Sequence, residues 1–227
     1  MRSVMTSVAS GLLAVSVASF TGKVAADPFD LYGDSIKFEV LRNGKPVGFH
    51  TTRFVRDGNG LEVRSEMSLK VPVFLMFSYQ MEYRANERWH DGVLIALDVD
   101  VARGGKEYRI DGRREGEIFS WSGPAGPRSE PLPLMPTSHW NGAVINASRV
   151  LNTLTGNINY VSILREDLET VQTGNGPREA YRYVYEGDLE TKVWYDDAGR
   201  WVKLRFEASD GSIIEYRCRE CGIATGA

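Results

Sequence analysis

The chain of 227 residues is poor in the residue types that build metal and thiol centres. It holds three histidines, His50, His90 and His139, and two cysteines, Cys218 and Cys221. The histidines fall in different predicted elements and lack ligand spacing such as i and i+4, whereas a zinc site needs three or four convergent ligands. We therefore expect no metal site, and we expect each histidine at an exposed strand or turn position.

Catalytic motifs are missing as well. The sequence has no Gly-x-Ser-x-Gly elbow, and Gly174-Asn175-Gly176 lacks the third glycine and the strand-to-helix context of a dinucleotide loop. Helix capping explains Ser138 better than a nucleophile paired with His139. The pairs Glu166-Asp167 and Asp196-Asp197 lie near turn signals, which favours solvated acids over a general acid and base. These absences predict a protein that is not an enzyme and carries no cofactor.

Basic clusters and long apolar runs are also missing. The formal net charge is −3 and no stretch concentrates Lys or Arg, so nucleic acid is a poor partner. A membrane-spanning helix needs about 20 apolar residues in succession, and no segment of the sequence reaches that length. We expect a protein without a membrane span.

The first residues carry the clearest positive signal. Arg2 precedes an apolar stretch, Val8–Phe20, and the small residues Val24-Ala25-Ala26 follow it, which is typical of a cleaved export signal. The sequence therefore predicts a signal peptide over residues 1–26 and a single β-rich domain over residues 27–227. The short, simple leader is of the bacterial kind, so we expect the mature protein in the periplasm.

Most of the remaining chain alternates apolar and polar residues between glycine turns. Ile36 and Phe38 share one face, and Asn43-Gly44 turns the chain into a return strand. The same pattern continues through residues 35–121 and resumes over residues 159–218, which indicates hairpins in series and hence an antiparallel meander. A meander of this length must curl to bury its apolar face.

The region between these two stretches has a different pattern. Residues 123–136 are rich in proline, which excludes a central strand and marks a long connection. An amphipathic helix is predicted over His139–Asn152, with its N-cap from Thr137-Ser138 and with Trp140 and Val144 on its apolar stripe. The predicted fold is mainly β, a curved antiparallel sheet or partial barrel with this one helix packed on its concave face.

Three blocks of the sequence together resemble a family of exported, uncharacterised proteobacterial β proteins, a domain of unknown function. They occur in the family's order and spacing at Lys37–Gly48, Pro136–Asn141 and Tyr185–Leu204. The resemblance spans nearly the whole mature chain. It implies a fold akin to the curved half-barrels that carry lipoproteins through the periplasm, and it implies no catalytic residue.

The two cysteines, Cys218 and Cys221, have the spacing of a redox motif. A thioredoxin-type role requires that motif at a helix start within a βαβ unit, which the predicted elements lack. The oxidising periplasm favours a structural disulfide instead. Residues i and i+3 of a straight strand face opposite ways, so this bridge requires the strand to end and turn after Cys218.

An apolar run, Val71–Phe77, stands out in the mature chain. It either folds under the sheet and fills the core, or it forms the lip of an apolar cavity. We take the second interpretation as a hypothesis for ligand binding. The residues assigned to that site are Val73, Phe74, Leu75, Met76, Phe77, Trp140 and Val144.

The function that these features favour is a non-enzymatic periplasmic protein that binds an apolar ligand, such as a lipid or lipid-like small molecule, or an envelope partner protein. Two alternatives stay open. One is an envelope hydrolase with a dispersed active site, which would show two or three titratable groups converging in one pocket. The other is a purely structural factor of envelope assembly. A carrier would show a cavity lined by Phe, Met, Leu and Val.

Overall fold

The computed structural model describes residues 27–58, 60–74 and 77–222, with the backbone alone at residues 72–74, 77 and 78. Within these residues, fifteen strands form one sheet. A short helix, α1 (Pro28–Tyr32), and a 3-10 helix, η1 (Gly142–Asn146), accompany them. The strands are β1 (Ser35–Arg42), β2 (Lys45–Asp57), β3 (Gly60–Phe74), β4 (Phe77–His90), β5 (Val93–Arg103), β6 (Lys106–Glu115), β7 (Ile118–Gly123), β8 (Gly126–Pro131), β9 (Met135–Pro136), β10 (Arg149–Leu151), β11 (Ile158–Thr173), β12 (Gly176–Gly187), β13 (Thr191–Asp196), β14 (Trp201–Glu207) and β15 (Ile213–Glu220).

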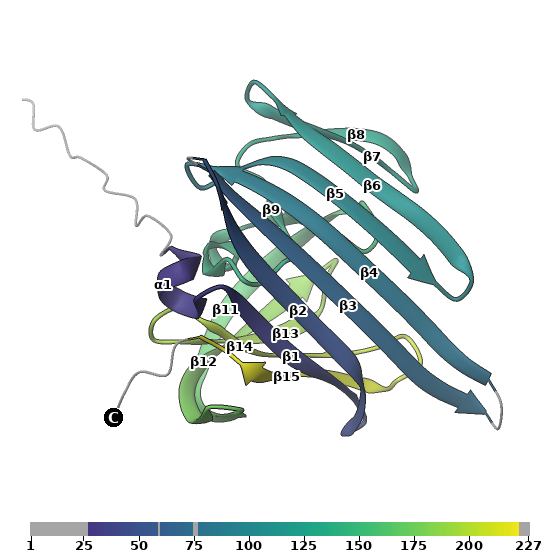
Figure 1. Ribbon diagram of the computed structural model, residues 1–227, viewed down its shortest axis with the longest axis vertical. Coiled ribbons are helices and arrows are strands. Elements are labelled where there is room, and N and C mark those ends of the chain that lie inside the picture. The colour runs from purple at the N-terminus through teal and green to yellow at the C-terminus, as the bar shows by residue number, and fades with distance from the viewer. Residues whose placement is uncertain (1–26, 59, 75–76, 223–227) are drawn as a thin grey trace, which may run out of the picture.

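The chain enters the sheet in its middle. Strands β1 to β8 step outward to one edge, and we call them the N-terminal half. Residues 132–157, the crossing segment, then carry the chain to the opposite edge, where β9 and β10 pair in parallel. Strands β11 to β15, the C-terminal half, step back until β15 pairs with β1. All other pairs are antiparallel, so the predicted mainly-β meander is confirmed (Figure 1).

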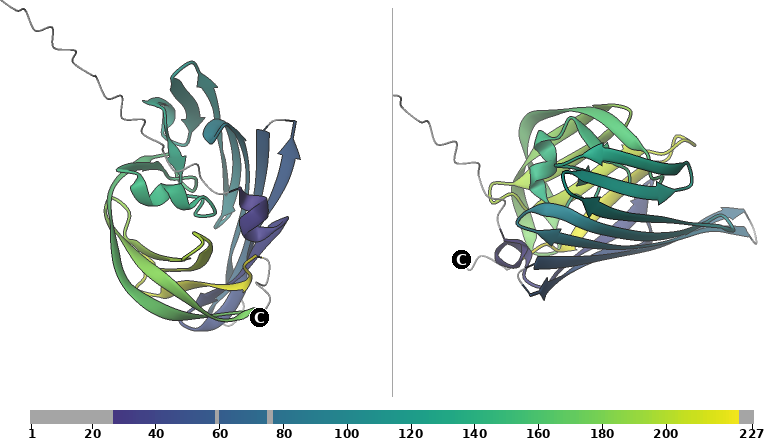
Figure 2. Two further views of the ribbon diagram at one scale, coloured as in Figure 1. Left: turned by 90° about the vertical axis from the view of Figure 1, so that its left-hand side faces the viewer. Right: turned by 90° about the horizontal axis from the view of Figure 1, so that it is seen from above.

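The two halves differ in curvature. Figure 2 shows the green and yellow strands of the C-terminal half curving round to face the purple-to-teal strands of the N-terminal half. The end of β11 returns to β15, because the Gly174 N–H donates to the Cys218 carbonyl at 2.9 Å. A Cβ atom at Gly174 would overlap the backbone carbonyl of Arg219, so this close approach requires glycine.

The core lies between the two halves. Alternate side chains of the N-terminal strands point inward, and Val63 in β3, Val99 in β5 and Ile110 in β6 are completely buried. The C-terminal half contributes larger rings, Tyr185 and Trp201. Burial of one such apolar side chain stabilises the fold by about 1.5–3 kcal/mol.

The hairpin turns follow the predicted chemistry. Asn43 and Gly44 have φ angles of 48° and 78°, and Asp91 and Gly92 have φ angles of 49° and 74°. A two-residue turn with positive φ at both positions is of type I′, whose twist matches that of the flanking strands. Both dipeptides therefore turn the chain into the next strand at the positions that the sequence predicts.

The predicted amphipathic helix over His139–Asn152 is wrong. This stretch instead forms η1 and β10, and Asn141, not Thr137-Ser138, caps η1 by accepting a hydrogen bond from the Ala143 N–H at 3.0 Å. Asparagine and glycine are weak helix formers because they favour turns and flexible backbone. Pairing of β10 with β9 and β11 then satisfies backbone groups that a helix would have paired internally.

Two further differences concern short elements. The proline-rich connection contains β8, which lies at a free edge of the sheet, where proline is tolerated. Before β1, the Asp27 side chain caps α1 by accepting from the Phe29 N–H at 2.9 Å.

Neither helix of the described chain has the length and hydropathy needed to cross a bilayer. The predicted signal peptide, residues 1–26, lies outside the described residues and stays a prediction.

Candidate functional site

A cavity of about 200 Å³ lies between the two halves, under the crossing segment. Its wall is mainly apolar, and one end is polar. The N-terminal half contributes strands β2, β3 and β4, and the C-terminal half contributes β13, β14 and β15. The lining residues include His50, Met67, Tyr83, Ser138, His139, Thr153, Glu190, Trp201, Leu204, Phe206 and Tyr216.

Two histidines stand on either side of Trp201 at the polar end. The ring centroids of His50 and His139 lie 5.7 Å and 5.6 Å from that of Trp201. Burial lowers the pKa of His50 to about 4 and that of His139 to about 3, so both rings are neutral at pH 7. The prediction of exposed histidines is therefore wrong for these two residues, while His90 is exposed.

A bulge in β2 turns His50 inward. The regular register that follows the Asn43-Gly44 turn would place Phe49 opposite Phe38. Val47 is an extra residue in β2, so the partner of Phe38 is His50. A shift of one residue moves each later side chain to the other face of the sheet, which explains why Phe49 is 49% exposed. An alternating pattern alone does not reveal such a bulge.

A carboxyl group, that of Glu87, is completely buried beside the polar end. Its Oε2 atom accepts hydrogen bonds from Trp89 Nε1 at 2.9 Å and from Trp140 Nε1 at 3.1 Å. Burial raises the pKa of Glu87, and the nearby Ser138 hydroxyl and the two indoles lower it by less. Glu87 Oε1 and Ser138 Oγ make no hydrogen bond of standard geometry within the described chain. Sequence patterns did not single out Glu87, because a lone acid in a strand is usually exposed.

A row of hydroxyl groups attaches the crossing segment to β4 at the rim of the cavity. Tyr83 donates to Thr153 Oγ1 at 3.0 Å, and the Thr153 N–H donates to Thr137 Oγ1 at 3.1 Å. These bonds join residues far apart in sequence, and they hold residues 137–139 over the cavity.

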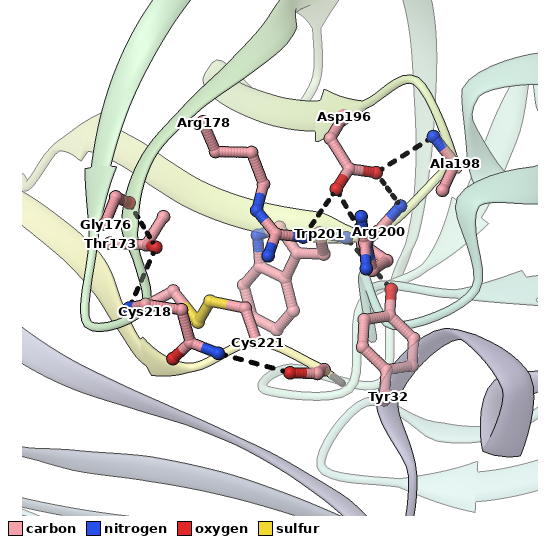
Figure 3. A network of polar contacts seen from close by, with 12 residues as sticks. Tyr32, Thr173, Gly176, Arg178, Asp196, Ala198, Arg200, Trp201, Cys218 and Cys221 are labelled. Carbon is pink, nitrogen blue, oxygen red and sulfur yellow. Dashed lines mark hydrogen bonds and ion pairs between the residues drawn. A yellow bond between two sulfur atoms is a disulfide. The ribbon is translucent and has the colours of Figure 1, made fainter. Parts of the chain in front are cut away.

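Behind Trp201 lies a buried ionic network, which Figure 3 shows from close by. The Asp196 side chain is completely buried and pairs with Arg178 at 2.8 Å and with Arg200 at 2.7 Å. It also accepts from the backbone N–H groups of Ala198 and Arg200. The prediction of a solvated turn acid is therefore wrong for Asp196, whereas the adjacent Asp197 is exposed.

Tyr32 of α1 links this network to the crossing segment. Its hydroxyl accepts from the Trp201 N–H at 2.9 Å and donates to the Trp140 carbonyl at 3.0 Å. Asp196 and Tyr32 accept from the N–H groups of Arg200 and Trp201 and so fix the backbone that carries the Trp201 ring, which forms part of the cavity wall. The position of this ring thus depends on three separate segments of the chain.

Cys218 and Cys221 lie at disulfide distance, with Cα atoms 5.9 Å apart, and Figure 3 shows the bridge between them. The sequence pattern predicts that the strand ends after Cys218, and this prediction is wrong. β15 continues to Glu220, with Arg219 as an extra residue between the partners of Lys37 and Phe38. The bulge bends the strand and brings residues i and i+3 together.

Comparison with known proteins places the chain in a family. The model of the domain of unknown function DUF6134 matches residues 38–219. This protein belongs to that family. A β-barrel-like protein of the domain of unknown function DUF1849 from Brucella abortus has a similar structure, with a TM-score of 0.62, 9% sequence identity and coverage of 85% of this chain and 98% of that one. The likeness shows the fold alone.

No curated protein matches the sequence. The names of the DUF6134 family and of the DUF1849 protein assign no catalytic activity. Within the described residues of this DUF6134 protein, no three His, Cys, Asp or Glu side chains lie close enough together to hold a metal ion.

Five of the seven site residues predicted from sequence cannot be placed relative to the cavity. Leu75 and Met76 lie outside the described residues, and Val73, Phe74 and Phe77 are described by their backbone alone, at the ends of β3 and β4. The last pair between β2 and β3 joins Gly48 to Leu69, and β3 continues beyond it with β4 as its partner. Pro72 therefore interrupts no hydrogen-bond ladder on the β2 side of the strand.

Trp140 and Val144 are buried as the apolar stripe predicts, but neither is among the residues that line the cavity. Trp140 packs edge-on against Phe54 and Trp89, at centroid distances of 5.6 Å and 5.5 Å. Both residues belong to the packed core beside the cavity. The apolar wall is formed instead by side chains such as Met67 and Leu204, which the sequence analysis did not assign to a site.

Proposed function

We propose that this protein is a non-enzymatic protein of the periplasm that binds a small apolar molecule, or one apolar group of a lipid, in the cavity beneath the crossing segment. The observation that carries the proposal is the cavity itself, whose wall is mainly apolar with a few polar groups. Such a lining is typical of a site for a small molecule.

The volume of the cavity limits the ligand. An apolar cavity of about 150 Å³ binds benzene, whereas sites for drug-sized molecules measure about 300–1,000 Å³. A volume of about 200 Å³ accordingly suits one ring or a short alkyl chain. It is too small for the acyl chains of a whole diacyl lipid, which narrows the lipid ligand expected from the sequence.

The titration behaviour of the cavity residues favours binding over catalysis. A general base works best when its pKa lies near the working pH. The pKa values of His50 and His139, about 4 and about 3, make both rings weak bases at neutral pH. His50, His139 and Ser138 do line one pocket, as the hydrolase alternative requires, but Ser138 lacks an effective base among these histidines, which favours the binding function.

Binding of toluene to the purified protein tests the proposal. A ligand that binds the folded state alone adds about 1.4 kcal/mol to the free energy of unfolding at ten times its Kd. We expect toluene to raise the unfolding midpoint in urea and to shift the NMR signals of the methyl groups of Met67 and Leu204, which line the cavity.

Two variants supply the comparison. Leu204→Trp adds volume inside the cavity and should abolish the toluene effect. Leu164→Trp adds the same ring type on β11, at a side chain that is 50% exposed, and should leave the effect intact. Absence of any stabilisation or shift in the wild-type protein at saturating toluene would refute ligand binding and leave a structural or partner-binding role.

A further inference from the structure

Three side chains that line the cavity have buried polar atoms without a hydrogen bond of standard geometry among the described residues, and of these the Ser138 hydroxyl lies near the Glu87 carboxyl. The Nδ1 atoms of His50 and His139 and the Oγ atom of Ser138 are buried, and none has a standard hydrogen bond in the described part of the chain. All three residues line the cavity. A buried polar atom without a partner costs about 1–3 kcal/mol, so such atoms in a native protein call for an explanation.

The three groups can both donate and accept hydrogen bonds. A neutral imidazole has one donor nitrogen and one acceptor nitrogen, and its tautomer decides which nitrogen donates. The serine hydroxyl also donates and accepts. Because residues 137–139 belong to the crossing segment and His50 belongs to β2, two separate parts of the chain present these groups to the same space.

The charges around the cavity argue against an ionic ligand. No Lys or Arg is among its lining residues, and the one acid there, Glu190, is exposed. Glu87 lies behind Ser138, where burial favours the neutral carboxyl. A carboxylate or phosphate group would therefore lose its hydration without gaining a positively charged partner.

We propose that the cavity selects an uncharged ligand with one hydroxyl group on a small apolar body, such as a phenol or a short alcohol. The hydroxyl binds to His50, Ser138 and His139, and the apolar body packs against Met67, Trp201 and Leu204. This inference rests on the proposed function, because it names the ligand class of the same cavity.

Three ligands built on the same ring test the inference. Toluene, p-cresol and p-toluate share one ring and one methyl group, and they differ in carrying no polar group, a hydroxyl or a carboxylate. We would measure the Kd of each at pH 7 by titration followed by NMR. p-Toluate should bind more weakly than both others, and the ratio of the Kd of toluene to that of p-cresol serves as the measure of hydroxyl recognition.

Three variants remove the polar groups one at a time: His50→Phe, His139→Phe and Ser138→Ala. One hydrogen bond contributes about 0.5–1.5 kcal/mol, so each variant should lower that ratio by about 2-fold to 10-fold. Met67→Leu in the apolar wall is the matched control, and it should change both Kd values alike. Ser138→Ala is the smallest change and keeps the test valid if a histidine variant fails to fold.

The outcomes separate the two proposals. If toluene binds but the ratio stays constant in all three variants, the hydroxyl specificity is wrong and the proposed function stands. Tighter binding of p-toluate than of p-cresol would likewise overturn the choice of an uncharged ligand. If neither toluene nor p-cresol binds to the wild-type protein, the proposed function fails and this inference fails with it.

Discussion

The two halves of the sheet are stabilised in different ways. In the N-terminal half, long strands pair with their neighbours in sequence, and ion pairs such as Arg53–Glu66 are exposed on both sides. In the C-terminal half, the ion pairs of Asp196 are buried, and Gly174 of the β11–β12 turn makes a backbone contact with β15. Exposed ion pairs contribute little to stability, whereas loss of one partner of a buried pair is costly.

This difference explains where the cavity forms. The N-terminal half follows from local hairpins and packs its inner face with alternating apolar residues. In the C-terminal half, buried polar groups hold the backbone next to Trp201, with Tyr32 reaching it from α1 and Asp196 bonding within its own turn. The cavity lies between the two halves of the sheet, and the crossing segment covers it. Variants on each side of this boundary can therefore test the comparison.

The largest effect is expected at the contact between the crossing segment and the N-terminal half. Trp140→Ala removes a buried ring and one donor to Glu87, and should lower the free energy of unfolding by about 5 kcal/mol. On the other side, Tyr195→Phe removes a hydroxyl that donates to the His139 carbonyl, and should cost about 1 kcal/mol. Urea unfolding measures both, and equal losses would show that the two halves hold the segment equally.

The next effect concerns the buried ions of the C-terminal half. Asp196→Ala removes the buried carboxylate that pairs with Arg178 and Arg200 and should lower the free energy of unfolding by about 3–5 kcal/mol. Asp197→Ala, one residue further along the same turn, should change urea unfolding little because Asp197 is exposed. A small loss at Asp196 would remove the distinction between the two halves.

A smaller effect follows from the histidines, which join the N-terminal half to the crossing segment. In the folded protein the pKa is about 4 for His50 and about 3 for His139, while the ordinary value is 6.5. Between these values the unfolded chain binds more protons, so stability falls as the pH decreases below about 6.5. The loss from each ring is on the order of 3 kcal/mol across that range.

Urea unfolding between pH 4.5 and 7.5 measures this dependence. His139→Phe should flatten the profile, because it removes the ring whose pKa burial lowers. Glu87 acts in the opposite direction, since its raised pKa makes stability fall as the pH rises above about 4.5. An unchanged profile in His139→Phe would contradict the burial of this ring.

The smallest effect is expected from the disulfide in the C-terminal half. A bridge between Cys218 and Cys221 closes a loop of four residues, and it should add at most about 2 kcal/mol to the free energy of unfolding. Mass spectrometry after thiol alkylation should find both cysteines blocked until reduction. Two alkylated thiols in unreduced protein would refute the bridge, and a loss on reduction larger than that of Asp196→Ala would reverse the order of the two contributions.

Sequence reasoning succeeded where the determining chemistry is local. The Asn43-Gly44 and Asp91-Gly92 dipeptides start hairpins because their backbones tolerate positive φ, and this property needs no distant partner. It failed for His139–Asn152, where the spacing of Trp140 and Val144 suggested a helix. The same spacing arises when an irregular segment crosses a core and buries whichever side chains face it.

By itself, the sequence determined the antiparallel meander, its turns and the apolar alternation of its strands, because these depend on residues close together in the chain. Only the tertiary structure decided which polar residues are buried. His50 faces inward because one extra residue in β2 shifts its register, and the buried Asp196 pairs with Arg178 of the neighbouring strand β12 and with Arg200 of its own turn. The cavity exists only where both halves and the crossing segment meet, so no single stretch of sequence encodes it.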